Sequence, residues 1–430
     1  RTNTNATFLQ NINVSGTVTA TSYAGDGSAL TGIAATANVR TGILDVAGIS
    51  TFRNTMNVGA AVTISESGIE ASGIGITVAD INGGQIGGRR NLIINGSMEV
   101  AQRGTSFTND GYGIDRFWWG MFGMDQAQTT RTQSTDAPSG FKYSQKINVT
   151  TVETSIDSGE RAYIRYRIEG QDLHQLATGA SGAKKLTLSF YAKSASNNSG
   201  HQYSVYLSNH DISGSDRIQT RSFTVTSTWQ RFAFTFDGQE DIIIRNDNDY
   251  GLQLFISLAA HSSYEASAIT SWTNSTYKVV SGQSNFLAST NNDFFITGVQ
   301  LEVGSQATAF EHRSFHEERL LCQRYYQEIE GNSDVVMWGS GRASTSANAL
   351  VNTPLSVPLR ASPTISQTSY TTWGTAGSHS VDNQTPTVQY FSANNTFLPM
   401  NFHSTSSLTN ARVATVACRD GSSLVMDAEL

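Results

Sequence analysis

The sequence predicts an all-β protein, and three observations support this. Ser (52) and Thr (48) together occupy 100 of the 430 positions and Gly another 38, while charged residues make up only 15%. Helical proteins need more Ala, Leu, Glu and Lys, whereas this composition suits short strands joined by turns. Apolar and polar residues alternate over many short segments. With 38% apolar and 10% aromatic residues, the chain can also build buried cores.

We expect four parts along the chain, and the first is a repetitive β-stalk with a Gly-rich hinge, residues 1–90. An apolar residue, Asn or Asp, Val and then Gly recur at 12–16, 44–48 and 56–59. Strands this short cannot bury an apolar edge alone, so copies must stack or chains must associate. We therefore expect a fibrous stalk that is a homotrimer; the alternative is a flexible low-complexity linker. Four glycines between 81 and 88 form the joint, where trypsin is expected to cut after Arg89 or Arg90 if they are exposed.

Residues 91–313 are expected to form one β-sandwich or jelly roll. Short alternating segments are separated by clusters of Gly, Asn, Asp and Ser, which is the pattern of such folds. The strand candidates are 185–192, 203–207, 222–226, 231–236 and 252–258.

Residues 314–332 are expected to form a connecting helix. Ser314 with Glu317 three residues on is a capping box, and Phe315, Cys322 and Ile329 recur every seven residues. The last part, 333–430, is expected to be a small β-sandwich at the tip. It holds five of the six prolines, and its last two strands are expected at 413–417 and 423–426, around a turn.

Several segments resemble bacteriophage tail fibres and receptor-binding proteins. The segment NLIINGSME at 91–99, followed by QRG at 102–104, is similar to the opening of their sandwich domains, and FFITGVQLEVG at 294–304 to the close. The helix segment 318–326, the stalk phrase YAGDGSALTG at 23–32 and PLSVPLR at 354–360 are similar to further parts of such fibres. The segment 228–236 makes the sandwich look like a carbohydrate-binding jelly roll. The resemblance implies a virion protein that binds a cell-surface glycan.

The resembling modules often hold a structural calcium ion, through the Glu of the opening motif and an acidic pair before the closing Val. Here Glu99 is present, but Thr297 and Gly298 replace the acidic pair. Because calcium takes about six to eight oxygen ligands, preferably carboxylates, we expect no metal and no cofactor.

Charge and cysteine content narrow the classes of partner. The net charge is −7 and no run of Lys or Arg occurs, so we expect no nucleic-acid partner. The low charge also favours a neutral polyol ligand over an ionic one. Apolar stretches are strand-sized, so no membrane span is expected. Cys322 and Cys418 are isolated, and Cys322 is expected to be a buried thiol.

Glycans are bound by flat aromatic side chains with a few polar groups. The candidate ligand-binding residues are aromatics in loops or at strand ends: Trp118, Trp119, Tyr264, Trp272, Tyr277, Trp338, Trp373 and Tyr390. Trp118 and Trp119 must point to opposite faces if they lie in a strand, so one of them is core. Trp229 is expected in the core, and Trp272 and Trp373 are expected to be exposed.

No catalytic residues are expected, because no pair of carboxylates is picked out by spacing. We expect a phage tail fibre protein that mediates host recognition and adsorption by binding surface polysaccharide or lipopolysaccharide. It would be assembled in the host cytoplasm and joined to other tail proteins through a segment upstream of Arg1. The alternatives are a tailspike that depolymerises glycan, a purely structural fibre segment and a bacterial trimeric surface adhesin.

Overall fold

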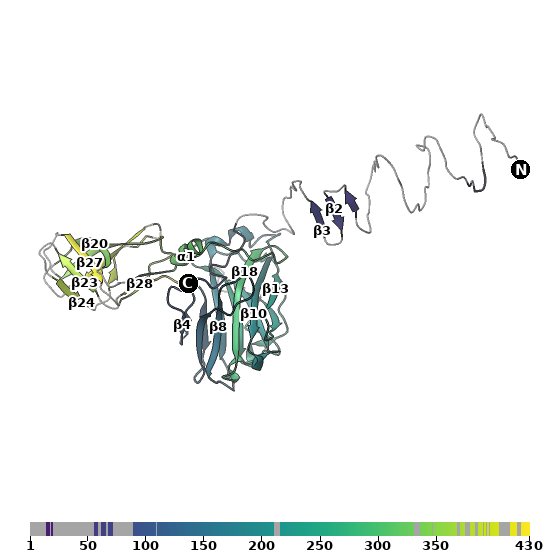
Figure 1. Ribbon diagram of the computed structural model, residues 1–430, viewed down its shortest axis with the longest axis horizontal. Coiled ribbons are helices and arrows are strands. Elements are labelled where there is room, and N and C mark those ends of the chain that lie inside the picture. Colours follow the sequence, from purple (N-terminus) through teal and green to yellow (C-terminus); the bar gives the residue numbers. More distant parts are fainter. Residues whose placement is uncertain are drawn as a thin grey trace, which may run out of the picture. The chain divides into compact units, whose positions relative to one another are not determined.

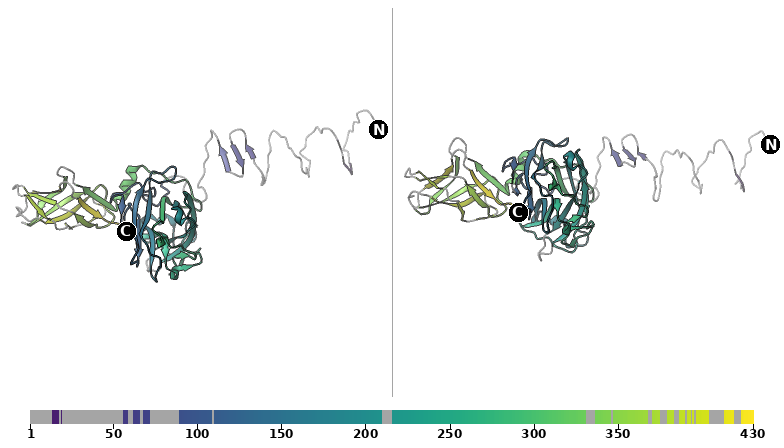
Figure 2. Two further views of the ribbon diagram at one scale, coloured as in Figure 1. Left: turned by 60° about the horizontal axis from the view of Figure 1, so that its bottom comes forward. Right: turned by 90° about the horizontal axis from the view of Figure 1, so that it is seen from below.

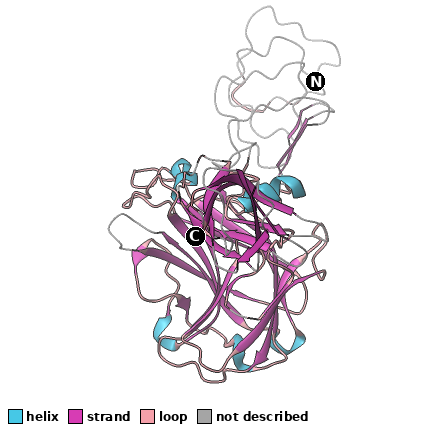
Figure 3. Cartoon of the chain, turned by 90° about the vertical axis from the view of Figure 1, so that its left-hand side faces the viewer, coloured by secondary structure: helices cyan, strands magenta, loops and turns pink. Residues whose placement is uncertain are grey.

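The computed structural model describes residues 14–17, 19, 56–58, 62–65, 68–71, 89–108, 110–209, 216–330, 336–345, 347–367, 370–374, 379–382, 386–389, 391–392, 394, 396–403, 413–418 and 423–430. The chain divides into two compact units, residues 1–77 and 78–430. Strands dominate the described part, as Figure 3 shows in magenta, and the expected all-β class is confirmed. None of the helices in the described ranges combines the length and the apolar character that a membrane crossing needs.

The first unit contains one small antiparallel sheet, with the strand order β1 (Met56–Val58), β2 (Val62–Ser65) and β3 (Gly68–Ala71) (Figure 1). Met56 is opposite Ile64, and Val62 is opposite Ala71. The pattern expected at 56–59 therefore includes a strand. The segment 44–48, the phrase at 23–32 and the joint at 81–88 lie outside the described residues, and the trimer stays a prediction.

Two antiparallel sheets form the sandwich in the second unit (Figure 2). The six-stranded sheet has the order β13 (Gln230–Phe236), β10 (Leu186–Ser194), β18 (Asp293–Val303), β8 (Ser144–Thr151), β7 (Gln128–Ser134) and β4 (Ser106–Phe107). The seven-stranded sheet has the order β16 (Thr273–Asn274), β12 (Arg217–Thr224), β11 (Gln202–Asn209), β14 (Tyr250–Ala260), β9 (Arg161–Glu169), β6 (Trp118–Phe122) and β5 (Gly111–Tyr112). All five strand candidates of this region lie on or overlap these strands.

The core of the sandwich lies between the two sheets. Alternate residues of β10, such as Leu188 and Phe190, are fully buried there and meet alternate residues of β11 and β9, such as Val205 and Ile164. Because side chains alternate across a strand, the residues between these core positions of β11 and β9 lie on the other face of the seven-stranded sheet. We call this the outer face.

The connecting helix is shorter than expected. α1 (Phe315–Gln323) begins at Ser314, whose Oγ accepts a hydrogen bond from the Glu317 N–H at 3.3 Å, as the capping box predicts. The expected continuation to residue 332 is wrong, because β19 (Tyr326–Glu330) is a strand paired with β28 (Ser423–Asp427). Pairing with a distant strand outweighs the weak helical pattern of a short segment.

The C-terminal part is a small two-sheet structure. A three-stranded sheet has the order β19, β28 and β22 (Thr364–Gln367). A seven-stranded sheet has the order β24 (His379–Asp382), β23 (Tyr370–Gly374), β27 (Val413–Cys418), β20 (Val336–Ala343), β21 (Asn348–Pro354), β26 (Phe397–His403) and β25 (Thr387–Val388). Both sheets contribute to one core, which includes Trp338 and Met426. The two last strands form as expected, but they lie in different sheets and are not a hairpin.

The chain end connects this part to the sandwich through buried charges. Glu429, whose side chain is 3% exposed, forms an ion pair with Arg116, which is 1% exposed. The guanidinium of Arg116 lies over the ring of Tyr325, 3.3 Å from its centroid, and donates to the backbone oxygen of Arg167. Burial raises the pKa of Glu429, and Arg116 opposes that rise. This pair links the end of the chain to the strands of the sandwich.

Candidate functional site

Strand β9 places an unusual row of side chains on the outer face. Ala162, Ile164, Tyr166 and Ile168 point into the sandwich core, so Arg161, Tyr163, Arg165 and Arg167 share the opposite face. Along a strand, Arg161 and Arg165 are about 13 Å apart and Arg165 and Arg167 about 7 Å. The next residue of the alternation, Glu169, is fully buried and paired with Arg324. Three arginines without an intervening acid therefore line one strand.

Neighbouring strands surround Arg165 with aromatic side chains. The register places five residues side by side across the outer face, in the order Tyr112, Trp118, Arg165, Phe255 and Tyr206. Tyr206 and Phe255 stack with ring centroids 4.4 Å apart, and Tyr163 meets Phe255 edge to face at 5.2 Å. These rings form an apolar cluster separate from the sandwich core.

Gly120 determines how Trp118 lies in this cluster. A Cβ atom at Gly120 would lie 1.9 Å from Cζ3 and 2.0 Å from Cη2 of Trp118, so the indole ring covers the glycine. The guanidinium of Arg165 lies over the indole, with Cζ 4.3 Å from the ring centroid. Trp118 is half-buried, and its ring centroid lies 5.7 Å from that of Tyr163. The absence of a side chain at 120 thus lets Trp118 lie along the sheet and support Arg165.

The other two arginines are also held by aromatic rings. The guanidinium Cζ of Arg167 lies 4.1 Å from the ring centroid of Tyr250. The Nε–H of Arg167 donates to Oε1 of Gln253 at 2.9 Å. Arg161 lies 5.0 Å from the ring centroid of Tyr264 and 5.3 Å from that of Phe122, which is 57% exposed. Among the described residues, no carboxylate forms an ion pair with any of the three. Cation–π contacts replace salt bridges here.

A segment between β14 and β18 covers one side of the outer face. It includes η4 (Ser262–Tyr264), β15 (Glu265–Ala266) and β17 (Val279–Val280). The Val280 N–H donates to Oγ of Ser204 on β11, and the Gln283 side chain donates to the backbone oxygen of Ser257 on β14. Tyr206 is consequently only 3% exposed, while the three arginines and Trp118 are half-buried. The accessible part of the outer face lies over β9 and β6.

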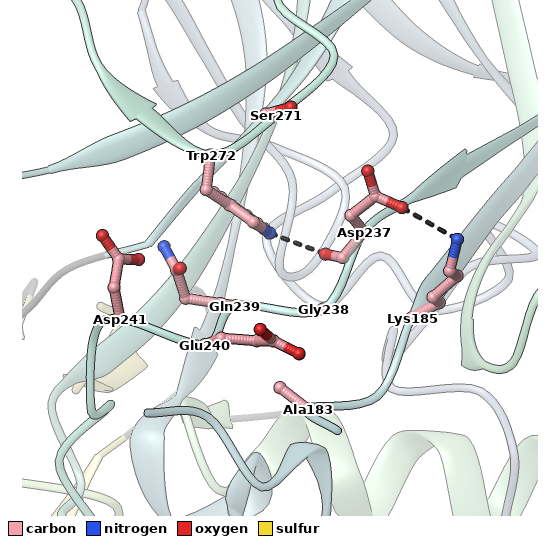
Figure 4. A pocket seen from close by; sticks show the side chains of 9 residues that line it. All are labelled: Ala183, Lys185, Asp237, Gly238, Gln239, Glu240, Asp241, Ser271 and Trp272. Carbon is pink, nitrogen blue, oxygen red and sulfur yellow. Dashed lines mark hydrogen bonds and ion pairs between the residues drawn. The ribbon is translucent and has the colours of Figure 1, made fainter. Parts of the chain in front are cut away.

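A second candidate site is the pocket beside Trp272, with a volume of about 420 Å³ (Figure 4). The indole N–H of Trp272 donates to the backbone oxygen of Asp237 at 2.6 Å, which holds the ring as one wall. The three carboxylates of the pocket already have protein partners. Asp237 pairs with Lys185 at 2.9 Å, Asp241 pairs with Arg217 at 3.1 Å, and Glu240 accepts from the Gly182 N–H. We therefore consider the outer face the stronger candidate.

The expected ligand-binding aromatics do not gather at one place. Trp118 and Tyr264 lie at the outer face, Trp272 lines the pocket, and Tyr277 is 47% exposed in the covering segment. Trp119 and Trp338 are 0% exposed and cannot contact a ligand, because each packs in a core. The expected opposition of Trp118 and Trp119 is confirmed. Tyr390 and the side chain of Trp373 lie outside the described residues.

Two expectations of exposure need correction. Trp229 is half-buried rather than core, since its indole N–H donates to Asp136 and its ring contacts Phe295 near the surface. Trp272 is half-buried against the sandwich core rather than exposed.

The three arginines and most of the rings around them are not among the ligand-binding residues that the sequence predicted. The available signal was the alternation RAYIRYRI at 161–168, in which Arg and Tyr occupy one face and apolar residues the other. The rings that meet this row come from β6, β14 and η4, and no local pattern connects them to it.

Comparisons with known proteins give similarities of structure only. No protein-family model matches the chain, and no curated protein matches its sequence. One similar solved structure is the enzymatically active domain of tailspike protein 4 from bacteriophage CBA120, at 13% identity and a TM-score of 0.27. The match covers 50% of this chain and 21% of that one, so the chain spans about a fifth of the tailspike structure.

Two further similar structures are carbohydrate-binding modules. The CBM22-1 xylan-binding domain of Paenibacillus barcinonensis Xyn10C matches at 9% identity and a TM-score of 0.26, covering 53% of this chain and 100% of that one. A family 11 module of the Clostridium thermocellum cellulase Lic26A-Cel5E matches at 15% identity and a TM-score of 0.24, covering 49% and 98%. Similarities at this level establish neither a family nor a ligand for this chain.

Proposed function

We propose that this chain is a phage tail fibre protein that binds a cell-surface glycan through the outer face of its sandwich. The observation that carries the proposal is the arrangement of Arg165 over Trp118, with the exposed Phe122 beside Arg161. Flat rings lie beside hydrogen-bond donors on one rigid sheet, which is the chemistry that recognises the apolar faces and hydroxyl groups of sugars. A site built on paired strands is also held in place before the ligand arrives.

The phage role is supported by the sequence resemblances to tail fibres at 91–104, 294–304 and 318–326. A homotrimer would place three such faces on one fibre. Many weak sites on one particle would then act together, because the second and later contacts are intramolecular. Measurement of the mass in solution tests this part, and a monomer at micromolar concentration would contradict it.

The glycan-binding role is tested with the full chain on an array of bacterial surface polysaccharides. We expect binding to some polysaccharides and a loss of at least about tenfold in affinity for Trp118→Ala. The matched control is Trp229→Ala, a half-buried tryptophan elsewhere on the sandwich that contacts Phe295. No binding on the array, or equal binding by Trp118→Ala, would overturn the assignment of the outer face.

Incubation of the full chain with the polysaccharides that bind on the array distinguishes binding from cleavage. We propose a binder, so the polysaccharide should keep its chain length after prolonged exposure to the protein. Shortened chains would identify a depolymerase. Intact chains with no binding would favour a purely structural segment of a fibre.

A further inference from the structure

We propose that the ligand of the outer face is an acidic glycan, whose carboxylate or phosphate groups are bound by Arg161, Arg165 and Arg167. This inference rests on the proposed glycan-binding function and specifies the chemical class of the ligand. It differs from the expectation of a neutral ligand that the low overall charge supports.

The first argument is the local excess of positive charge. The chain carries a net charge of −7, yet β9 presents three arginines on one face, and no described carboxylate pairs with them. Several acids elsewhere on the sandwich have cationic partners, for example Asp293 with Lys146 and Asp136 with Lys193. Guanidinium groups without an acidic partner are available to an anion from outside.

The second argument is that Arg165 and Arg161 disfavour the positive charge of two neighbouring cations. The pKa of Arg167 is lowered, first by burial and then by Arg165. The pKa of Lys278, in the covering segment, is lowered by burial and by Arg161, against the opposing effect of Asp216. An anionic group placed among these cations would relieve that repulsion.

The third argument is preorganisation. Each guanidinium lies against a ring, with Arg165 at Trp118, Arg167 at Tyr250 and Arg161 at Tyr264. The Nε atoms of Arg161 and Arg165 are buried and have no hydrogen-bond partner within the described ranges. A planar guanidinium held at a fixed place donates two parallel hydrogen bonds to a carboxylate or phosphate, and a lysine cannot replace this geometry.

The fourth argument is the combination of charge with apolar surface. Phe122 is 57% exposed at one side of the arginine row, and Trp118 lies within it. A small free anion would contact the guanidinium groups but not these rings. A sugar that carries an acidic group can contact both kinds of side chain. An acidic glycan is therefore the occupant that uses the whole surface.

The experiment compares matched polymers on the full chain. The acidic probes are polygalacturonate, hyaluronate and a phosphomannan, together with any polysaccharide that binds on the array. Each is compared with its own carboxyl-reduced or dephosphorylated form. We expect binding to fall by at least about tenfold when the acidic group is removed, and to weaken several-fold between 50 and 500 mM salt. The carboxyl and phosphate arms decide which acid the face prefers.

Substitutions locate the effect. Arg165→Gln is expected to lower the affinity for the acidic form about tenfold or more, and the residual affinity for the neutral form by a clearly smaller factor. Arg165→Lys should recover only part of the loss, because it keeps the charge but not the planar donor. The control is Arg231→Gln, an exposed arginine on β13 that donates to Ser189 and Thr308. Thermal unfolding of each variant checks that it is folded.

The outcomes separate the two proposals. Equal affinity for acidic and neutral forms, with Trp118→Ala still harmful, overturns the acidic ligand and leaves the glycan-binding face in place. If neither form of any polymer binds, the proposed function fails, and this inference fails with it.

Discussion

The guanidinium of Arg165 lies 4.3 Å from the ring centroid of Trp118, directly across from it in the register of β9 and β6. The stacking is possible because Gly120 leaves room beneath the indole. The two side chains come from strands that are far apart in the sequence. Their contact defines the centre of the outer face, and its consequences can be measured.

Gly120→Ala should disturb the outer face through Trp118. The added Cβ would lie about 2 Å from two indole carbons, so the ring must move and Arg165 loses its support. We expect glycan affinity to fall to the level of Trp118→Ala, with a stability cost of about 1–3 kcal/mol from overpacking. Adding Trp118→Ala to Gly120→Ala should restore stability but not binding, as a double-mutant cycle would reveal. Additive stability losses would exclude this contact as the cause.

Glu429→Ala should destabilise the second unit strongly. The change leaves Arg116 buried without its acidic partner, and such losses cost about 3–5 kcal/mol. Denaturant unfolding gives the free energy of unfolding. The control is Glu317→Ala, whose ion pair with Arg89 is exposed, and we expect it to change stability by less than about 0.5 kcal/mol. A small effect of Glu429→Ala would mean that Arg116 finds another partner or water.

Cys322 should resist thiol reagents in the folded protein. The side chain is 0% exposed, and burial, followed by the nearby Asp115 and Glu318, raises the pKa of its thiol well above the ordinary value. Reaction requires the thiolate and access, so modification should be slower by at least about a hundredfold than in denaturant. Peptide mass spectrometry distinguishes Cys322 from Cys418. Rapid native labelling of Cys322 would show that α1 opens readily.

Trypsin should cut slowly after Arg89 and Arg90. The N–H groups of Arg90 and Asn91 both donate to Oε2 of Glu311, at 3.0 and 2.6 Å, so neither peptide bond is free to enter a protease. Glu311→Ala should therefore increase the appearance of chains that begin at Arg90 or Asn91. Glu317→Ala, which removes only the exposed pair with Arg89, should have little effect. Equal cleavage of all three proteins would show that these hydrogen bonds do not protect the joint.

Much of the fold was predictable because strand patterns are local. Alternation indicated five strands of the sandwich, β10 to β14, and the N-cap at Ser314 indicated the start of α1. Alternation also required the adjacent Trp118 and Trp119 to point to opposite faces. The length of the helix was not predictable in this way. Tyr326–Glu330 has no strong local preference, and its partner β28 lies about a hundred residues further along the chain.

The candidate site was less predictable than the fold. Aromatic residues in polar surroundings suggested exposure, but Trp272 packs on the sandwich core and Trp338 fills the core of the C-terminal part. Whether a large ring is exposed depends on what packs against it, and those neighbours come from distant segments.

By itself, the sequence determined the all-β class and the positions of several strands, because side chains alternate with a period of two along a strand. The same alternation at 161–168 contains the information on which residues share a face of β9. The tertiary structure alone decided that β6 and β14 flank β9 and that the segment between β14 and β18 covers only one side of the outer face. Pairing register and loop packing are non-local, so they convert three separated arginines and several scattered rings into one surface.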